Sequence, residues 1–375
     1  MNAVHGLILT PEGWLRGTLT HDAGRIVAVQ GEPLGDEAWR GSDVPIVLPG
    51  FIDLHVHGGG GADTMQGGAA IDTIARTHAR HGTTALLATT MTAPHGEIEA
   101  ALRALAGTCA TRSQGAARVL GVHLEGPYIS PDKLGAQPAF AVTPSVSQIF
   151  ALAALAPIRI VTLAPELPGA LEATAALVAS GIRVQIGHSG ASYEQACAAL
   201  RAGASGFTHL FNAMSGLHHR APGAAGAALA HGRHAELIPD LLHVHPGAIR
   251  AALRAIPALY CVTDATAAAA MPNGEYRLGR HRVSKCSGGV RLPDGTLAGS
   301  TLMMDQALRN LVEGVGLGLR EASLRVSTHA AMYLGLTDRG VLSVGACADM
   351  AVLDARLRLR QVIVEGQGID VPDAV

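Results

Sequence analysis

Short apolar runs alternate with longer Ala-rich segments through the middle of the chain. The apolar runs lie at residues 51–57, 83–90, 119–126, 159–164, 183–188, 206–211, 237–244 and 258–264. Segments of helical period separate several of them, at 68–81, 95–106, 168–180, 191–202 and 246–255. Because strands that alternate with helices form right-handed parallel units, this pattern predicts an α/β fold, a (β/α)₈ TIM barrel.

The two ends of the chain carry a different pattern. Residues 1–47 and 338–375 contain short alternating stretches separated by Gly and Pro, which predict β-strands. Neither end can enclose a core alone, so we expect them to join in one small β-sandwich domain, with the barrel at 48–337. Two helices near 300–315 and 320–334 would return the chain to that domain, and a hairpin insertion is expected at 270–297.

Composition narrows the class of protein. Hydrophobic residues make up 48% and charged residues 15%, which is typical of a globular chain with a large core. The net charge of −2 gives no electrostatic footprint for nucleic acid, and no apolar run reaches the ~20 residues of a membrane span. The five cysteines contain no CxxC pair, which suits a reducing compartment. We therefore expect a cytoplasmic protein that binds neither nucleic acid nor membrane.

Polar residues gather where the predicted strands end. His55 and His57 are two apart on the first strand, so both imidazoles project from one face and could bind a divalent metal. An isolated HxH pair fits an ordinary half-buried strand equally well. Four further strands, however, end in or present Glu125, His188, His209 and Asp264. Since such strand ends meet at one barrel mouth, and a buried cluster of this kind is costly without a compensating charge, a bound metal is the economical explanation.

Several segments together carry a specific resemblance. The HxH strand is followed in order by HLEGPY, GHSGASYEQA, THLFNAM and CVTDAT. This combination resembles the N-acetylglucosamine-6-phosphate deacetylases of the amidohydrolase superfamily along nearly the whole chain. The resemblance implies a metal-dependent hydrolase that removes acetate from a 2-acetamido sugar 6-phosphate, in amino-sugar catabolism and recycling.

The resemblance also implies a metal site and a proton-transfer group. Glu125, His188 and His209 match the family's main metal ligands, and Asp264 matches its catalytic acid and base. His55 and His57 are kept as in two-metal members, so they would hold a second ion together with Asp264. One or two ions per subunit are therefore expected, Zn²⁺ first, with Fe²⁺, Co²⁺ or Mn²⁺ as alternatives.

Substrate contacts follow from the same resemblance. His243 matches a histidine that contacts substrate and polarises the amide carbonyl, and Arg220 matches an arginine that reaches the neighbouring active site of a homodimer. The other implied substrate-binding positions are Ala136, Gln137, Asn212, Ala213, Leu297, Ala298 and Gly299. Gln137 stands where the family often has a substrate-contacting histidine, so sugar recognition at that position is open.

Alternative functions remain at this point. The same chemistry could act on the galacto epimer, or the chain could be another amidohydrolase such as a cyclic imide hydrolase or an acyl-amino-acid deacylase. Many such enzymes place a carboxylated lysine after strand four, where this chain reads Ala164-Pro165-Glu166. A non-catalytic scaffold would be expected to lack ligands that this chain keeps.

The run Gly58 to Gly61 is expected to form a flexible loop over the barrel mouth rather than a phosphate cradle.

Overall fold

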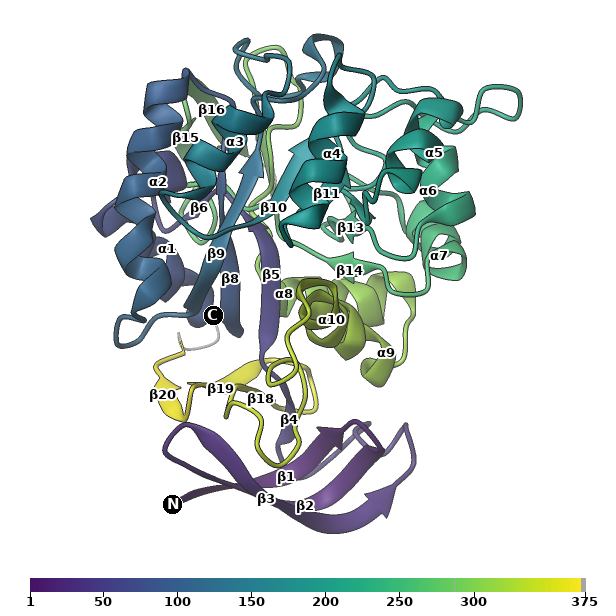
Figure 1. Cartoon of the computed structure of the whole chain (residues 1–375). Helices are drawn as coiled ribbons and strands as arrows, with labels where there is room; N and C mark the ends of the chain where they lie inside the picture. The colour runs from purple at the N-terminus through teal and green to yellow at the C-terminus, as the bar shows by residue number, and fades with distance from the viewer. Residues whose placement is uncertain (287, 372–375) are drawn as a thin grey trace.

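The structure is a computed structural model that describes residues 1–286 and 288–371. It has two parts, a barrel and a separate sheet beneath it, as Figure 1 shows. Ser287 of the predicted hairpin insertion and residues 372–375 of the predicted terminal segment lie outside the described residues. No helix within the described ranges is long and apolar enough to cross a membrane.

Parallel strands form the wall of the barrel. They are β5 (Phe51–Val56), β8 (Thr83–Thr90), β9 (Arg118–Glu125), β10 (Ile158–Leu163), β11 (Arg183–Ile186), β12 (Gly206–Phe207), β13 (Glu236–Leu237) and β14 (Tyr260–Cys261). The first six form one sheet, and β13 pairs with β14. Two main-chain hydrogen bonds close the ring, from Leu210 N to Glu236 O (2.8 Å) and from Asp264 N to His55 O (2.9 Å). The predicted barrel is confirmed.

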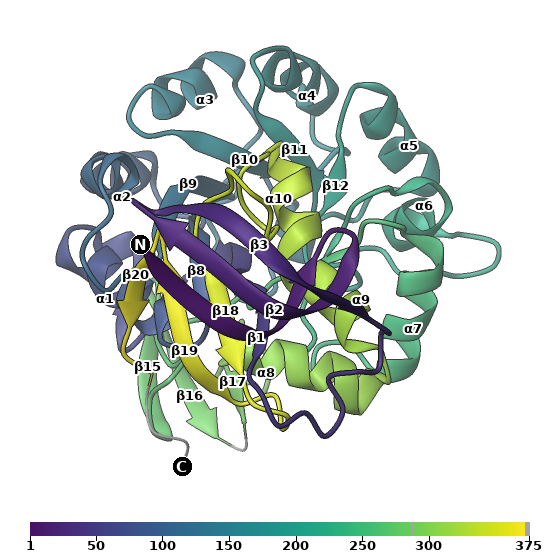
Figure 2. The same ribbon diagram turned by 90° about the horizontal axis from the view of Figure 1, so that it is seen from below.

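Helices surround the strands, as the view from below shows (Figure 2). The outer ring contains α1 (Ala69–Ala79), α2 (His95–Ala110), α3 (Val146–Ala153), α4 (Ala170–Ala179), α5 (Tyr193–Arg201), α6 (Gly223–His231) and α7 (Pro246–Ala255). The sequence did not predict α3 and α6. The first six residues of α6 are all buried and are all Gly or Ala. This part of the helix therefore has no alternation of polar and apolar positions that would reveal a helical period.

The chain leaves the barrel through helices close to the predicted ranges. α8 (Met304–Arg309) continues into a π-helical segment at Asn310–Val315. α9 (Leu319–Ser323) leads through a second such segment, Leu324–Thr328, into α10 (His329–Leu334). The first helix thus begins later than the expected residue 300.

Both ends of the chain build the second part together, as predicted, but their strands join in one sheet of seven strands rather than in the two stacked sheets of a sandwich. Its sheet has the order β20-β19-β18-β4-β1-β2-β3. The strands are β1 (Asn2–Thr10), β2 (Gly13–Asp22), β3 (Arg25–Leu34), β4 (Ile46–Pro49), β18 (Met350–Leu353), β19 (Leu359–Val364) and β20 (Gln367–Ile369). The strands from the two ends of the chain share one buried apolar cluster, which includes Ile8, Leu19, Val47 and Met350. The domain boundaries at 47/48 and 337/338 stay predictions.

Two small β elements lie near the barrel mouth. The insertion at 270–297 contains β15 (Gly274–Leu278), β16 (His281–Cys286) and a third strand, β17 (Gly289–Arg291). The glycine run is a packed hairpin of β6 (Gly58–Gly59) and β7 (Ala62–Asp63), not the expected loop over the mouth. A Cβ on Gly58 would lie 2.5 Å from Ala267 N, so glycine serves close backbone approach there.

Candidate metal centre and active site

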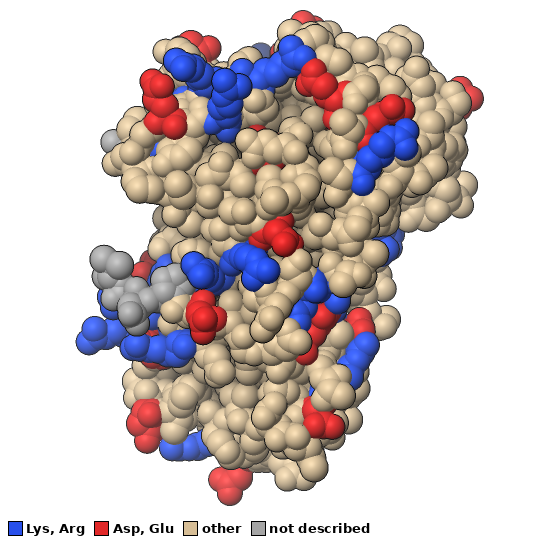
Figure 3. All heavy atoms as spheres, turned by 90° about the vertical axis from the view of Figure 1, so that its left-hand side faces the viewer, with Lys and Arg blue, Asp and Glu red and all other residues tan. Residues whose placement is uncertain are grey.

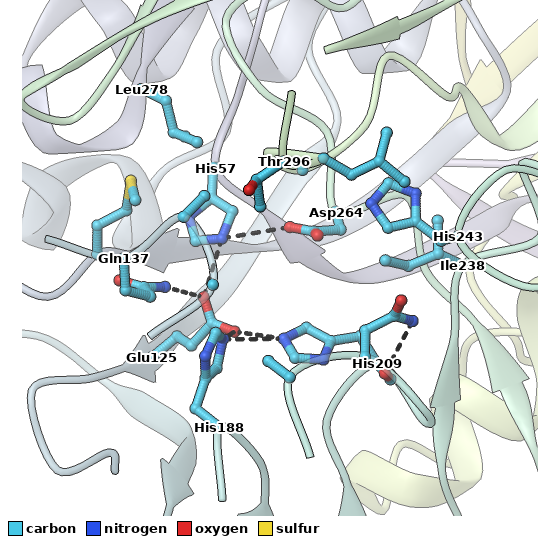
Figure 4. A pocket seen from close by; sticks show the side chains of 17 residues that line it. His57, Glu125, Gln137, His188, His209, Ile238, His243, Asp264, Leu278 and Thr296 are labelled. Carbon is cyan, nitrogen blue, oxygen red and sulfur yellow. Dashed lines mark hydrogen bonds and ion pairs between the residues drawn. The ribbon is translucent and has the colours of Figure 1, made fainter. Parts of the chain in front are cut away.

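A cavity of about 210 Å³ opens at the C-terminal end of the barrel strands (Figure 4). It is lined by His57, Met91, Glu125, Gly135, Ala136, Gln137, His188, His209, Asn212, Ala213, Ile238, His243, Asp264, Leu278, Thr296, Leu297 and Gly299. Loops from many different strands therefore supply its walls, as expected for the mouth of a barrel.

Glu125 lies at the centre of the site and is shared by two pairs of histidines. Its Oε1 lies 3.2 Å from His188 Nε2 and 3.0 Å from His209 Nε2. Its Oε2 lies 3.0 Å from His57 Nε2 and 3.5 Å from His55 Nε2. The carboxylate, nearly fully buried, thus presents one oxygen to each pair.

The histidine pairs have the arrangement of metal ligands. The Nε2 atoms of His55 and His57 lie 3.2 Å apart, and those of His188 and His209 lie 3.1 Å apart. Two neutral imidazoles cannot direct their lone pairs at each other at this distance without a proton or a cation between them. Each pair joins Glu125 in a group whose ligand atoms lie within 4.8 Å of one another. Nitrogen and carboxylate donors of this kind suit zinc and neighbouring divalent transition metals.

The electrostatics of the cluster also favour bound cations. Burial alone would lower the pKa of His57, but hydrogen bonds and charge from Asp264 and Glu125 raise it to about 9. Burial likewise opposes charge on His55, yet Glu125, Glu236 and Asp264 hold its pKa well above the ordinary value. Carboxylates therefore dominate the field here, and they stabilise positive charge at the Nε2 atoms, whether as protons or as a metal ion.

Asp264 lines the cavity beside this cluster. Its Oδ1 lies 3.3 Å from His57 Nε2 and 3.5 Å from His55 Nε2, and Figure 4 shows its carboxylate facing His57. The residue follows β14 with φ of +50°, and two other cluster members have positive φ, His188 (+47°) and His209 (+29°). Such backbone conformations are costly for side chains with a Cβ and are typical of functional sites. They turn these side chains out of the strand ends.

Hydrogen bonds at Nδ1 orient two histidines of the cavity, His188 and His243. The Nδ1 of His188 lies 2.8 Å from the Lys133 carbonyl oxygen, which leaves Nε2 facing Glu125. His243 Nδ1 lies 2.6 Å from Asp240 Oδ2. Burial opposes charge on His243, but this carboxylate outweighs it and raises the pKa of the imidazole.

Sequence reasoning missed two carboxylates, Asp240 and Glu236. Asp240 lies three residues before His243, a spacing that could have suggested the pair. Glu236 contacts His55 from another strand. The one signal for it was a lone acid at the start of an apolar run.

Gln137 lines the cavity, and both ends of its amide contact other residues of the protein. Its Nε2 donates to Glu125 Oε2 at 2.6 Å, and its Oε1 accepts from the Thr92 main-chain N–H at 2.8 Å. Both ends of the amide are therefore engaged by the protein, and the side chain is nearly fully buried. In this structure Gln137 holds the central carboxylate rather than presenting a free group to a sugar hydroxyl.

Most other predicted substrate positions line the cavity, and two do not. Ala136, Asn212, Ala213, Leu297 and Gly299 lie on its wall. Ala298 instead packs into an apolar cluster with Met91 and Leu278, because its neighbours on either side face the cavity. Arg220 is exposed on the loop before α6, where its Nη1 lies 2.7 Å from His219 Nε2.

Known proteins resemble this chain along nearly its whole length. The chain is 40% identical to N-acetylgalactosamine-6-phosphate deacetylase of Escherichia coli O157:H7 over 96% of this chain and 97% of that protein. It is 41% identical to N-acetylglucosamine-6-phosphate deacetylase of Lysinibacillus sphaericus, over 86% and 84% of the two chains.

Solved structures give the same result. N-acetylglucosamine-6-phosphate deacetylase of Thermotoga maritima superposes with a TM-score of 0.89 at 32% identity, covering 99% of this chain and 100% of that one. A mutant of the Mycobacterium smegmatis enzyme in complex with N-acetyl-D-glucosamine-6-phosphate has a TM-score of 0.90 at 33% identity, with 98% of each chain covered. Residues 46–369 match the amidohydrolase family, and the chain belongs to that family.

Proposed function

We propose that this protein hydrolyses the acetamide of N-acetyl-D-glucosamine 6-phosphate and releases acetate and D-glucosamine 6-phosphate. The observation that carries the proposal is the shared Glu125 carboxylate between two histidine pairs, with Asp264 beside it at the cavity. Similarity to enzymes named for this reaction, one of them solved with the substrate, supports the choice of sugar.

The donor set fits a divalent metal, for which we propose Zn²⁺, with Fe²⁺, Co²⁺ or Mn²⁺ as alternatives. Glu125, His188 and His209 would hold one ion, and His55 and His57 with Glu125 and Asp264 would hold a second. When bound, such a metal lowers the pKa of water and polarises a carbonyl oxygen.

Asp264 and His243 would carry the remaining chemistry. Asp264 takes the proton from the attacking water as the new C–O bond forms at the acetyl carbon. It then passes that proton to the amide nitrogen as the C–N bond breaks, because an amide nitrogen leaves poorly unless it is protonated. His243, held by Asp240 at the cavity wall, would donate to the acetyl oxygen and stabilise the negative charge that develops there.

The phosphate would be bound jointly by two subunits of a homodimer. Asn212 and Ala213 lie on the cavity wall, whereas Arg220 of the same chain is exposed and does not line it. That position supports the proposal that Arg220 serves the active site of a second copy, where its planar guanidinium could bind a phosphate through two hydrogen bonds.

The galacto epimer is the second candidate substrate. One relative, 40% identical in an alignment that covers 96% of this chain, is named N-acetylgalactosamine-6-phosphate deacetylase. Steady-state assays on both 6-phosphates, with metal analysis of the same sample, test the proposal. We expect the higher kcat/KM for the gluco compound. A higher value for the galacto compound would reverse the assignment, and inactivity on both with metal bound would overturn the function.

We also infer a cytoplasmic location and no nucleic-acid partner. Five free cysteines support a reducing compartment. On the face shown in Figure 3, basic and acidic side chains lie in small separate groups within a largely uncharged surface, which does not resemble a continuous basic stripe.

A further inference from the structure

A buried carboxylate lies beneath the second histidine pair, on the side away from the cavity. Glu236 begins β13 and is completely buried. Its Oε2 lies 2.9 Å from His55 Nδ1. The other ring nitrogen of His55 faces the cluster, 3.2 Å from His57 Nε2 and 3.5 Å from Glu125 Oε2. One imidazole thus connects Glu236 to the proposed metal site.

This contact determines which nitrogen of His55 can bind a metal. A carboxylate accepts hydrogen bonds, so Nδ1 of His55 has to carry the proton that lies between it and Glu236. A neutral imidazole has one proton on its ring nitrogens, so Nε2 keeps its lone pair directed at the cluster. Carboxylates that orient metal-binding histidines in this way also increase their basicity.

Glu236 is itself held by further contacts from His209 and from Tyr260 of β14. Glu236 Oε2, the oxygen that contacts His55, also accepts from the His209 main-chain N–H at 3.3 Å. Its Oε1 accepts from the Tyr260 hydroxyl at 3.3 Å, and that hydroxyl in turn accepts from Gln185 Nε2 at 2.6 Å. Glu236 Oε2 therefore contacts the side chain of His55, from one histidine pair, and the main chain of His209, from the other pair.

A different role, in which Glu236 itself binds an ion, fits the geometry less well. His55, His123 and Glu236 do lie close enough to form a third metal-capable group. However, both ring nitrogens of His123 are already engaged, with Leu54 O at 3.1 Å and with Thr162 Oγ1 at 2.7 Å. Hydrogen bonding by Glu236 accounts for the arrangement without an additional ion.

We propose that Glu236 is a positioning residue for the second metal ion, because it fixes His55 with Nε2 free to bind that ion. This inference rests on the proposed metal-dependent function. It predicts that loss of the negative charge weakens one ion and spares the other, since His188 takes its orientation from Lys133 and the contact to His209 involves only the main-chain N–H, which an amide oxygen can still accept.

Zinc binding to the purified full chain tests the proposal. In Glu236→Gln, the His209 main-chain N–H keeps the amide oxygen at the position of Oε2, and this uncharged oxygen holds and polarises the His55 Nδ1–H more weakly than a carboxylate does. We expect the second zinc equivalent to bind about 10–100-fold more weakly in chelator competition, with the first equivalent unchanged. Tyr260→Phe is the matched control, because it removes a buried hydroxyl from the same network and keeps the contact between Glu236 and His55. It should retain both ions.

Three results would overturn the proposal. They are equal zinc affinities in Glu236→Gln and the unsubstituted chain, an equal defect in Tyr260→Phe, or a single equivalent in the unsubstituted chain under zinc excess. If Glu236→Gln does not fold, long-range ¹H–¹⁵N correlation of the zinc-loaded unsubstituted chain decides. A proton on His55 Nδ1 supports the proposal, and its absence refutes it. Because zinc alone is the probe, inactivity toward sugar phosphates would count against the proposed function and not against this inference.

Discussion

Gln137 donates a hydrogen bond to Glu125, with 2.6 Å between Nε2 and Oε2. Replacement by Met, which has similar length and no amide, should lower the melting temperature, because a hydrogen bond to a buried charged group contributes about 1.5–3 kcal/mol. KM for the sugar phosphate should stay close to its original value. Thermal melts and steady-state kinetics check both, with Gln361→Met on the exposed side of β19 as the control. A large increase in KM at an unchanged melting temperature would show that the amide contacts the sugar instead.

Asp264→Asn keeps the shape of the side chain and removes the base. Proton transfer typically contributes about 10²–10⁴ in rate, so kcat should fall by at least that factor while KM changes little. Metal analysis should still find the ion at Glu125, His188 and His209. If the variant keeps more than about a tenth of the original kcat, the proton-transfer role is wrong. Loss of the ion at Glu125, His188 and His209 would indicate that Asp264 is needed to hold that ion and not only to transfer protons.

Arg220→Ala tests the shared site. We expect a strong increase in KM for the 6-phosphate and little change in the poor turnover of unphosphorylated N-acetylglucosamine, because the guanidinium recognises the phosphate. Mixing inactive Asp264→Asn subunits with Arg220→Ala subunits should restore up to about a quarter of full activity, since half of randomly formed dimers contain one intact site. An active monomer, or no recovery after mixing, would place Arg220 in the active site of its own chain.

Glu365 links the terminal sheet to the barrel and should make stability depend on acid. It accepts from Arg118 Nε at 2.8 Å and Arg112 Nε at 2.9 Å, and also from Arg339. Burial opposes its charge, but these arginines lower its pKa from 4.5 to about 2. A carboxyl with a depressed folded-state pKa stabilises the protein above pH 4.5, and this contribution disappears as the pH falls toward 2.

The corresponding measurement compares melting temperatures at neutral and acidic pH. Glu365→Gln should melt well below the unsubstituted chain at pH 7, and the difference should shrink as the pH falls through the window between the two pKa values. Glu313→Gln, at an exposed position on the segment after α8, should show no such convergence. A difference that is constant with pH would mean that the arginine contacts do not depend on the charge of Glu365.

Much of this fold and site is visible in the sequence. α7 has the predicted bounds, 246–255, because Pro246 begins it and its apolar positions have a clear helical period. The strand ends that carry His55, His57, Glu125, His188, His209 and Asp264 meet as expected, because parallel strands place such ends at one mouth.

Other features depend on contacts that sequence does not encode locally. The predicted strand 206–211 is longer than β12, which ends at Phe207, because the chain turns sharply at His209 and Phe211, both with positive φ. Gln137 meets Thr92 and Glu125 through folding of distant loops. The same holds for Glu236 and His55, which lie on separate strands and share no recognisable spacing.

The pairing of β4 with β18 has a consequence for the order of folding during synthesis. Val352 pairs with Val47, so the hydrogen-bonding edge of β4 is completed by residues that are synthesised only after all the barrel strands. Until they leave the ribosome, Ile46, Val47 and Leu48, all fully buried in the finished protein, remain on an open strand edge. Unpaired apolar edges readily join other chains. The nascent chain therefore carries an aggregation-prone strand beside a barrel that is already assembling, and chaperone protection at this strand should last until β18 arrives.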